Sequence, residues 1–266
     1  MRHLIVGAGV IGKAFGIWLH ANKETVIFND IDLEKLAKLG KKGYLVLHEK
    51  TRIKEVDPHI IWICTAEWHV EDVIKQIPTN LPIVVRSTMK PRELYRLKND
   101  YSLLKFAHVP EFLTQNNALL DIFNEDRVII GTDNNTMREI LSHVYKDVTV
   151  PVVFTSLNES ALIKYTSNTW LAMCISYWNE IKQLCDCYDN VNPQLVADAT
   201  TLDKRISKYG SGMFGWPFGG FCFPKDTKAL IEIFKEFDIA PDLLNGIIKV
   251  NKKMEDKLDG INTTRN

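Results

Sequence analysis

Several features that would place this chain in a specialised class are absent. Lys plus Arg equals Asp plus Glu at 33 each in 266 residues, and no dense basic run carries interleaved aromatic residues, so nucleic acid is not an expected partner. No apolar stretch approaches the roughly 20 residues that span a bilayer, and the N-terminus reads directly into a strand instead of a signal peptide. We therefore expect a soluble, cytoplasmic protein with no membrane partner.

Cysteine is scarce as well. The five cysteines are an odd number at scattered positions, which suits reduced thiols better than a disulfide framework. The Cys185-Asp186-Cys187 pair lacks a second ligand pair at zinc spacing, so we interpret it as structural and predict no metal site. A hydrophobic content of 45% is ample for a packed core, in one large domain or two modest ones.

The N-terminus carries a glycine-rich turn between a predicted strand and a predicted helix. Apolar residues 2–6 lead into Gly7-Ala8-Gly9-Val10-Ile11-Gly12, and residues 13–21 have helical spacing. The first glycine permits the tight turn, the second lets the backbone approach a pyrophosphate, and the third lets the helix pack on the strand. A second strand, 25–28, leads to Asp30, whose carboxylate would bind a ribose hydroxyl and repel a 2′-phosphate, which predicts NAD instead of NADP.

Apolar runs and helical patterns continue to alternate through the first half. The later runs are 60–64, 83–85, 104–107, 128–130 and 152–154. This rhythm predicts a Rossmann-type, doubly wound, mainly parallel sheet over residues 1–155. Polar residues follow three of the strands, namely Thr65, Ser87-Thr88 and Glu111, and we expect them to line one crevice, although a turn or helix-cap role is the alternative for each.

The second half, 156–266, is predicted to be a mainly helical domain. Residues 160–188 form one long helical pattern with almost no Gly or Pro, so one face could be shared with a second subunit. The aromatic and Met side chains of that face could equally form an internal core stripe; they are Trp170, Met173, Tyr177 and Trp178. Lys164 and Asn168 are four residues apart, so their side chains project from the same side of the helix.

One cysteine stands in a setting that favours reactivity. Residues 215–226 are rich in glycine and place Cys222 close to Lys225 and Asp226, and a nearby cation favours thiolate over thiol. We expect Pro224 to fix the exit from the turn and a helix to follow over 225–237. A buried, unreactive structural cysteine is the alternative.

Taken together, these blocks resemble the UDP-glucose/GDP-mannose dehydrogenase family over nearly all of the chain. The matching segments are Gly7–Gly12, Ser87-Thr88, Pro110-Glu111-Phe112-Leu113, 126–131, 159–168, Asn179-Glu180, 202–206 and 218–226. The resemblance implies an NAD-dependent enzyme of polysaccharide biosynthesis that oxidises a nucleotide-sugar alcohol, UDP-glucose above all, to its acid. It also implies a homodimer through the long helix.

The resemblance further assigns roles to individual residues. The implied catalytic residues are Cys222, Lys164, Asn168, Asp226, Glu111 and Thr88. The implied cofactor-binding residues are Gly7, Gly9, Val10, Ile11, Gly12, Asp30, Lys35, Thr65, Ser87, Thr88, Glu111 and Lys225. The implied substrate-binding residues are Phe112, Leu113, Lys164, Asn168, Arg205, Phe218, Gly219 and Cys222. A surface ion pair with Asp203 is the alternative for Arg205.

The chain departs from the family pattern in a few places. Phe221 precedes the cysteine where many relatives carry serine, and His108-Val109 precedes Pro110 where Asn or Ser is more usual. Relatives continue into a third domain that supplies much of the nucleotide site, whereas this chain stops at Asn266, so we expect a short form. A non-catalytic NAD-binding or assembly module, a dehydrogenase of a smaller alcohol, and a β-hydroxyacid dehydrogenase are the alternatives, and the cysteine segment argues against the last.

Overall fold

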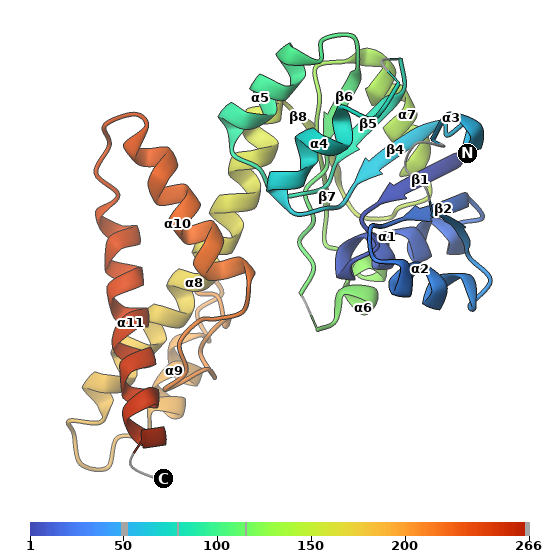
Figure 1. Ribbon diagram of the computed structural model, residues 1–266. Helices are drawn as coiled ribbons and strands as arrows, with labels where there is room; N and C mark the ends of the chain where they lie inside the picture. Colours follow the sequence, from blue (N-terminus) through green and yellow to red (C-terminus); the bar gives the residue numbers. More distant parts are fainter. Residues whose placement is uncertain (49–52, 79, 115, 264–266) are drawn as a thin grey trace. The chain divides into compact units, whose positions relative to one another are not determined.

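The protein divides into two compact units, Met1–Lys164 and Tyr165–Asn266, in a computed structural model that describes residues 1–48, 53–78, 80–114 and 116–263. The first unit holds an eight-stranded sheet in the order β3-β2-β1-β4-β5-β6-β7-β8 (Figure 1). Its strands are β1 (Arg2–Val6), β2 (Thr25–Asn29), β3 (Leu45–Leu47), β4 (Ile60–Ile63), β5 (Pro82–Val85), β6 (Lys105–His108), β7 (Val128–Gly131) and β8 (Val152–Thr155). The predicted α/β class with a doubly wound sheet is confirmed.

Neighbouring strands are parallel except at one position. The β6 and β7 strands pair antiparallel through His108 and Gly131, and every other neighbouring pair runs parallel. The strand order reverses at β1, which pairs with β2 on one side and with β4 on the other. Ligands of such sheets bind at the carboxyl ends of the strands where the order reverses. The glycine turn follows β1 and therefore lies at this point.

Helices cover both faces of the sheet. They are α1 (Val10–Ala21), α2 (Leu33–Gly40), α3 (Ile53–Val56), the 3₁₀ helix η2 (Glu67–His69), α4 (Val70–Ile74), α5 (Pro91–Asp100), α6 (Ala118–Phe123) and α7 (Asn135–Val144). The local sequence determines where several of these helices begin. Asp32 and Asn134 accept backbone hydrogen bonds at the first turns of α2 and α7, and Pro91 stands at the first position of α5.

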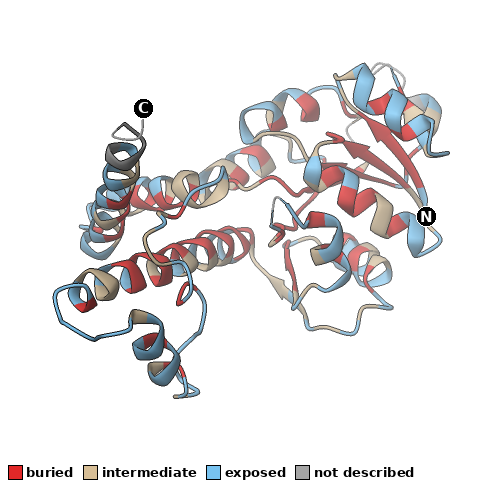
Figure 2. Cartoon of the chain, turned by 90° about the horizontal axis from the view of Figure 1, so that it is seen from below, coloured by how far each residue is buried: buried red, intermediate tan, exposed pale blue. Residues whose placement is uncertain are grey.

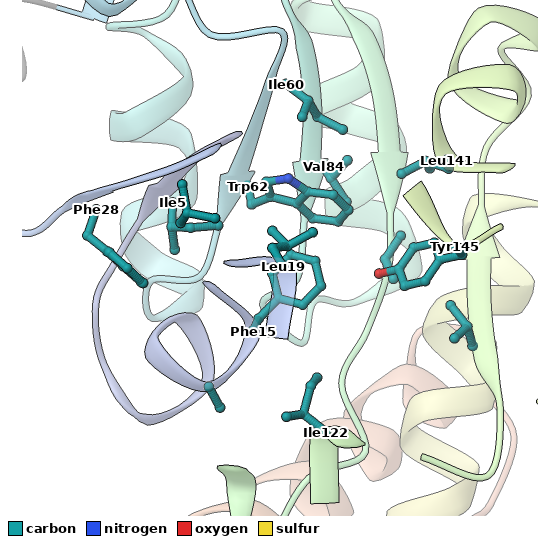
Figure 3. Close-up of a cluster of buried hydrophobic side chains, with 14 of the residues drawn as sticks. Ile5, Phe15, Leu19, Phe28, Ile60, Trp62, Val84, Ile122, Leu141 and Tyr145 are labelled. Atoms are coloured by element: carbon teal, nitrogen blue, oxygen red, sulfur yellow. The ribbon is translucent and has the colours of Figure 1, made fainter. Parts of the chain in front are cut away.

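The two faces of the sheet bury separate cores, and all of its strands except the edge strands β3 and β8 are buried along most of their length (Figure 2). On one face Ile5 and Trp62 pack with Phe15 of α1, and the Phe15 and Trp62 rings meet edge to face at 4.5 Å between centroids (Figure 3). On the other face Leu4 and Ile61 pack against α4 and α5. Because side chains alternate across a strand, a strand buried on both faces is apolar throughout.

The second unit is helical. It contains most of α8 (Leu157–Cys185), which begins in the first unit, and then α9 (Pro193–Thr200), α10 (Cys222–Lys235) and α11 (Asp242–Thr263). The predicted long helix is confirmed, with its start three residues earlier than expected. Among the described residues, none of the helices combines the length and the apolar character that crossing a bilayer requires.

The helix after the cysteine segment begins earlier than the sequence predicted. We expected it to start at Lys225, after Pro224, but α10 starts at Cys222. Pro224 is the third residue of the helix, where no intrahelical partner exists for a backbone N–H, so its missing donor costs nothing. The thiol is therefore at the first residue of a helix instead of in the loop before it.

Candidate active site

The glycine turn after β1 has the shape of a dinucleotide cradle. Gly7 has a φ of +97°, and a Cβ there would stand 2.8 Å from the backbone of Cys64. A Cβ on Gly12 would lie 1.9 Å from the Gly7 carbonyl oxygen, whereas a Cβ on Gly9 would meet nothing within 4 Å. Gly7 and Gly12 thus serve the turn itself, and Gly9 borders open space at the start of α1, where helix amides attract phosphate.

Asp30 lies against this turn. Its carboxylate accepts a hydrogen bond from the Ala8 backbone N–H at 2.6 Å and another from the Asp32 N–H at 2.9 Å. Lys35, the other residue implied for this side of the cofactor, is about half exposed on α2, 3.5 Å from an Asp32 oxygen. The loop after β2 is therefore held to the loop after β1, as a site for the adenosine half of a dinucleotide requires.

The polar residues that follow β4 and β5 are in contact with one another. The Ser87 hydroxyl donates to the Thr65 carbonyl oxygen at 2.6 Å, so the loop after β5 is fastened to the loop after β4. The Val109 N–H donates to the Val85 carbonyl oxygen at 2.9 Å, which continues the ladder to the loop after β6. Thr88 is half-buried beside them. The three loops thus stand side by side at the carboxyl edge of the sheet.

Glu111 and Lys164 form a buried ion pair in the first unit. Lys164 Nζ lies 3.2 Å from Glu111 Oε1, and their side chains are only 3% and 9% exposed. The other Glu111 oxygen accepts from the Leu113 N–H at 2.8 Å. The Phe112 ring lies under two cations, with Lys164 Nζ at 5.3 Å and the Arg127 guanidinium at 4.3 Å from its centroid. An acid and an amine are therefore held together, away from bulk water, beside a partly open aromatic ring.

His108 joins three segments around this pair, a role that the sequence did not reveal. Its Nδ1 lies 2.8 Å from the Ser160 hydroxyl and its Nε2 lies 3.3 Å from the Ser87 carbonyl oxygen. Burial lowers the pKa of His108 to about 3, so the ring is neutral near pH 7. Ser160 is one turn before Lys164 on α8. The sequence offered one indication of this role, because His108 is a polar residue at the end of an otherwise largely apolar strand.

A second buried cation lies below the crevice. Arg86 precedes Ser87, donates to the Tyr145 hydroxyl at 3.2 Å and stands 4.1 Å from the Phe15 ring centroid. Burial raises the pKa of the Cys64 thiol to about 12, although the Arg86 charge opposes this shift. Burial also raises the pKa of Glu125 to about 7 against the same opposing charge. Cys64 is therefore a neutral thiol, and we assign it a packing role.

In the second unit, Asp226 is the centre of a buried polar cluster. It is 1% exposed, one turn after Cys222 on α10. Asn168 Nδ2 donates to one carboxylate oxygen at 2.6 Å, and Lys225 Nζ donates to the other at 2.7 Å. Cys222 itself is half-buried. The thiol thus stands where helix amides favour negative charge, near a carboxylate held by an amide and an ammonium group.

The loop before Cys222 is held by two asparagines that the sequence did not identify as partners. Asn251 of α11 accepts from the Phe218 N–H at 2.6 Å and donates to the Phe218 carbonyl oxygen at 3.0 Å. Asn179 of α8 accepts from the Gly215 N–H at 2.7 Å and donates to the Trp216 carbonyl oxygen at 2.7 Å. Phe218 is buried, while Gly219 is exposed and open to a ligand.

Arg205 is placed apart from these clusters. Its side chain is 89% exposed and forms an ion pair with Asp203 at 2.6 Å within the same turn. This is the surface pair that the sequence offered as the alternative to a substrate contact, and a role toward a substrate stays a prediction. No group of three metal-binding side chains occurs in the described ranges.

Comparison with known proteins places two matches along the chain. Residues 63–149 match the NAD binding domain of the UDP-glucose/GDP-mannose dehydrogenase family, and residues 158–253 match its central domain. The UDP-glucose 6-dehydrogenase of Rhizobium meliloti (strain 1021) is 30% identical over 298 residues, covering 94% of this chain and 67% of the relative. The putative UDP-glucose 6-dehydrogenase YtcA of Bacillus subtilis (strain 168) is 27% identical with the same coverage.

A solved structure shows the same arrangement. A UDP-glucose dehydrogenase from the hyperthermophilic archaeon Pyrobaculum islandicum superposes with a TM-score of 0.84 at 25% identity, over 95% of this chain and 68% of that chain. The chain therefore spans about two thirds of the length of these relatives. The match to an NAD binding domain confirms the predicted cofactor.

Proposed function

The chain belongs to the UDP-glucose/GDP-mannose dehydrogenase family, and from this premise we propose that it oxidises the C6 alcohol of a nucleotide sugar to the carboxylate, as in the conversion of UDP-glucose to UDP-glucuronate. One observation carries the proposal. A half-buried thiol, Cys222, opens α10 one turn ahead of the buried carboxylate of Asp226. An alcohol dehydrogenase that stops at the carbonyl needs no thiol, whereas oxidation to an acid gains from a covalent intermediate.

NAD, when bound, accepts one hydride from the substrate carbon in each of the two oxidations. The open space at Gly9 and the amides at the start of α1 fit its pyrophosphate, and Asp30 fits a ribose hydroxyl. We assign the remaining contacts to Lys35, Thr65, Ser87, Thr88, Glu111 and Lys225. These residues bind and orient the cofactor.

In the first oxidation, Asp226 accepts the proton of the C6 hydroxyl, directly or through a water. Its carboxylate is held in place for this by Asn168 and Lys225. The ammonium group of Lys164 stabilises the negative charge that develops on the substrate oxygen. Loss of one proton and one hydride leaves the aldehyde.

In the second oxidation, the Cys222 thiolate bonds to the aldehyde carbon, and the carbonyl oxygen takes back the proton that Asp226 accepted, which gives a thiohemiacetal and returns Asp226 to its carboxylate form. Departure of a second hydride from that carbon and of the hydroxyl proton to Asp226 leaves a thioester on Cys222. The intermediate stays covalently bound, so no free aldehyde is released.

Glu111 completes the cycle by drawing a proton from a water that attacks the thioester carbon. The carbon to sulfur bond breaks, the carboxylate product leaves, and Cys222 is regenerated as a thiolate. Thr88 and Asn168 help to place the water. The remaining substrate contacts are assigned to Phe112, Leu113, Arg205, Phe218 and Gly219.

We also propose that two copies of the chain associate through α8. Trp170 and Tyr177 are 56% and 52% exposed, and because they are seven residues apart on α8 they lie on the same side of the helix, where together they offer an apolar surface. Trp178, by contrast, is buried within the second unit and Met173 packs in its core, so these two predicted contributors serve the fold of a single chain. Sedimentation at micromolar concentration should show a dimer that Trp170→Glu dissociates.

The proposed reaction is tested by its stoichiometry. We expect purified protein with UDP-glucose and NAD to release two NADH for each sugar oxidised, measured by absorbance with the sugar limiting. Cys222→Ser should abolish formation of the acid. Cys187→Ser is the matched control, because Cys187 is an exposed thiol of the same unit, and it should leave the stoichiometry unchanged.

Other results would redirect the assignment. Release of one NADH per sugar with free aldehyde would contradict the role of Cys222. NAD binding by calorimetry without turnover of any nucleotide sugar would select a non-catalytic NAD-binding module instead. Turnover of a small alcohol alone would select the smaller-substrate alternative.

A further inference from the structure

A pocket of about 450 Å³ lies in the first unit, at the end of α1 that is farther from the glycine turn. Its volume is within the range of about 300–1,000 Å³ that small-molecule sites have. The helix is 12 residues long, so roughly 18 Å separate its first turn at the cofactor cradle from its last turn at the pocket. Residues from the ends of α1, α6 and α7 line the pocket, and we call it the helix-end pocket.

The three helices contribute their C-terminal ends to this lining. Asn22 follows the last residue of α1, Phe123 ends α6 and Val144 ends α7. The last carbonyl groups of a helix lack an intrahelical N–H partner, and the helix dipole places a partial negative charge there. A cation that donates hydrogen bonds suits these groups, whereas an anion would be repelled.

Glu125, which follows α6, adds an unpaired carboxylate to the lining. It is half-buried, and among the described residues it forms neither a hydrogen bond nor an ion pair. Burial is the main cause that raises its pKa to about 7. Glu24, by contrast, already holds the N-terminal ammonium group of Met1 and lies 3.3 Å from His3 Nε2. Glu125 therefore lacks the donor that a half-buried carboxylate ordinarily has.

Trp18 gives the pocket an aromatic wall. Its indole packs against the Phe15 ring at 5.7 Å and the Tyr145 ring at 5.6 Å between centroids, which fixes its position. The Trp18 side chain is only partly buried and also lines the pocket. Trp is the aromatic residue that attracts ammonium groups most strongly, and methylene chains pack on such apolar surfaces. The pocket thus offers a carboxylate, carbonyl oxygens and an aromatic face.

The other charges of the pocket leave this preference for a cation in place. Lys23 and Lys146 are exposed cations of the lining. They offset the charges of Glu125 and Asp147, so the partial negative charges of the helix ends remain. A single metal ion is a poor match, because no three metal-binding side chains gather within the described residues. Carboxylates on separate loops, as here before β2, β7 and β8, suit a chain that carries more than one ammonium group.

We propose that the helix-end pocket binds a linear diamine or polyamine, with one ammonium group on the Glu125 carboxylate and the neighbouring helix carbonyls, and with the methylene chain along Trp18. Hydrogen bonds from an ammonium group to a carboxylate are about twice as strong as those between neutral groups. No described residue that we assign to the cofactor or the substrate lines this pocket, so the proposal stands apart from the proposed function.

Calorimetric titration of the wild-type protein at pH 8.5 provides the first arm of the test. The probes are 1,4-diaminobutane, 1,4-butanediol and magnesium chloride. The diol has the same chain without the charges, and magnesium has the charge without the chain. We expect saturable binding of the diamine at one site, and binding of neither of the other two.

Substitutions provide the second arm. Glu125→Gln should weaken diamine binding by about 10- to 100-fold, as for loss of a charged hydrogen-bond partner. The matched control Glu139→Gln removes an exposed carboxylate of α7 outside the pocket and should leave the affinity within about twofold. Lys23→Gln/Lys146→Gln should act in the opposite direction and tighten binding about 2- to 25-fold, because each lysine is an exposed charge that repels the ligand.

The pH dependence provides the third arm, because the diamine should bind the ionised form of Glu125. Aliphatic ammonium groups keep their charge below about pH 10, so the ligand does not titrate between pH 6 and pH 8.5. The charged and titratable groups around Glu125 are Arg86, Glu111, Arg127, Lys23, Glu24, His143, Lys146 and Asp147. Among them only the imidazole of His143 belongs to a class that ordinarily titrates in this range.

We expect the diamine to bind about tenfold more tightly at pH 8.5 than at pH 6, where only a minor fraction of Glu125 is ionised. At pH 6, titrations in buffers of different ionisation enthalpy should show release of about one proton for each diamine bound. Glu125→Gln should abolish both effects. His143→Gln is the matched control, and it should retain both.

Several results would overturn the proposal. These are absence of diamine binding at millimolar concentration, equal binding of the diol, and binding of magnesium alone, which would indicate a metal site instead. Equal losses of affinity in Glu125→Gln and Glu139→Gln would overturn it as a general effect of charge. Proton release that persists in Glu125→Gln and disappears in His143→Gln would also contradict it. A thermal melt of each variant confirms that it is folded.

Discussion

Removal of the Lys164 ammonium group is the sharpest perturbation of the first unit. Lys164→Met keeps the length of the side chain but leaves the Glu111 carboxylate buried without the cation 3.2 Å away. Loss of one partner of a buried ion pair costs about 3–5 kcal/mol, because the remaining charge stays desolvated. At about 2–4 °C per kcal/mol, the melting temperature of the first unit should fall by roughly 6–20 °C.

A second substitution tests the physical cause. Glu111→Gln in the Lys164→Met background removes the stranded charge and should recover more than half of the lost stability. Circular dichroism melts of the wild type, both single variants and the double variant close a double-mutant cycle, for which we expect a coupling of about 2 kcal/mol or more. Strictly additive losses would refute the pairing. Turnover should fall about 100- to 1000-fold in Lys164→Met, as expected for loss of an oxyanion partner.

Three further changes follow from contacts elsewhere. Gly12→Ala puts a Cβ 1.9 Å from the Gly7 carbonyl oxygen, so calorimetry should show loss of NAD binding, and unchanged affinity would contradict the cradle. Asn251→Ala removes both hydrogen bonds to the Phe218 backbone, so thermal melts should show a loss of about 1–3 kcal/mol in the free energy of unfolding. Activity assays should show a lower kcat, because the loop before Cys222 is then less firmly held. An unchanged kcat would contradict this support of the loop by Asn251. Glu125 has a pKa raised to about 7, so the folded state holds its proton more tightly than the unfolded chain does, and the resulting stability is lost as pH rises through 7. Glu125→Gln should therefore gain about 1–2 kcal/mol over wild type between pH 5 and pH 8.5 in denaturant titrations, and parallel pH profiles would contradict this.

Periodicity and glycine spacing predicted most of the first unit. The strands β4, β5 and β7 are apolar throughout because both sheet faces are covered there, and such runs are visible in a sequence. The short strand β3 was missed, since its three residues are too few to establish a period. The antiparallel pairing of β6 with β7 rests on a single pair of residues, His108 and Gly131, and no local pattern encodes it.

The sequence predicted those parts of the candidate site that are built from residues close together in the chain. It did not predict the contacts between residues that are far apart in the chain. Cys222 and Asp226 are one helical turn apart, so their proximity follows from spacing once the helix is known. The partners Asn251 and His108 lie 33 and 52 residues from the groups they hold, and only the fold brings them together. The helix start at Cys222 was misplaced because Pro224 was interpreted as a boundary, although proline is tolerated in a first turn.

The covalent step at Cys222 is the central claim, and mass spectrometry of protein quenched during turnover tests it most directly. Glu111→Gln should slow hydrolysis of the thioester, so this variant, incubated with UDP-glucose and NAD and quenched in acid, should carry the sugar-nucleotide acyl group on the peptide that contains Cys222. Asp226→Asn, which blocks the earlier proton transfer, should show none. An unmodified Cys222 in a variant that still reduces NAD, or an adduct on another cysteine, would contradict the account.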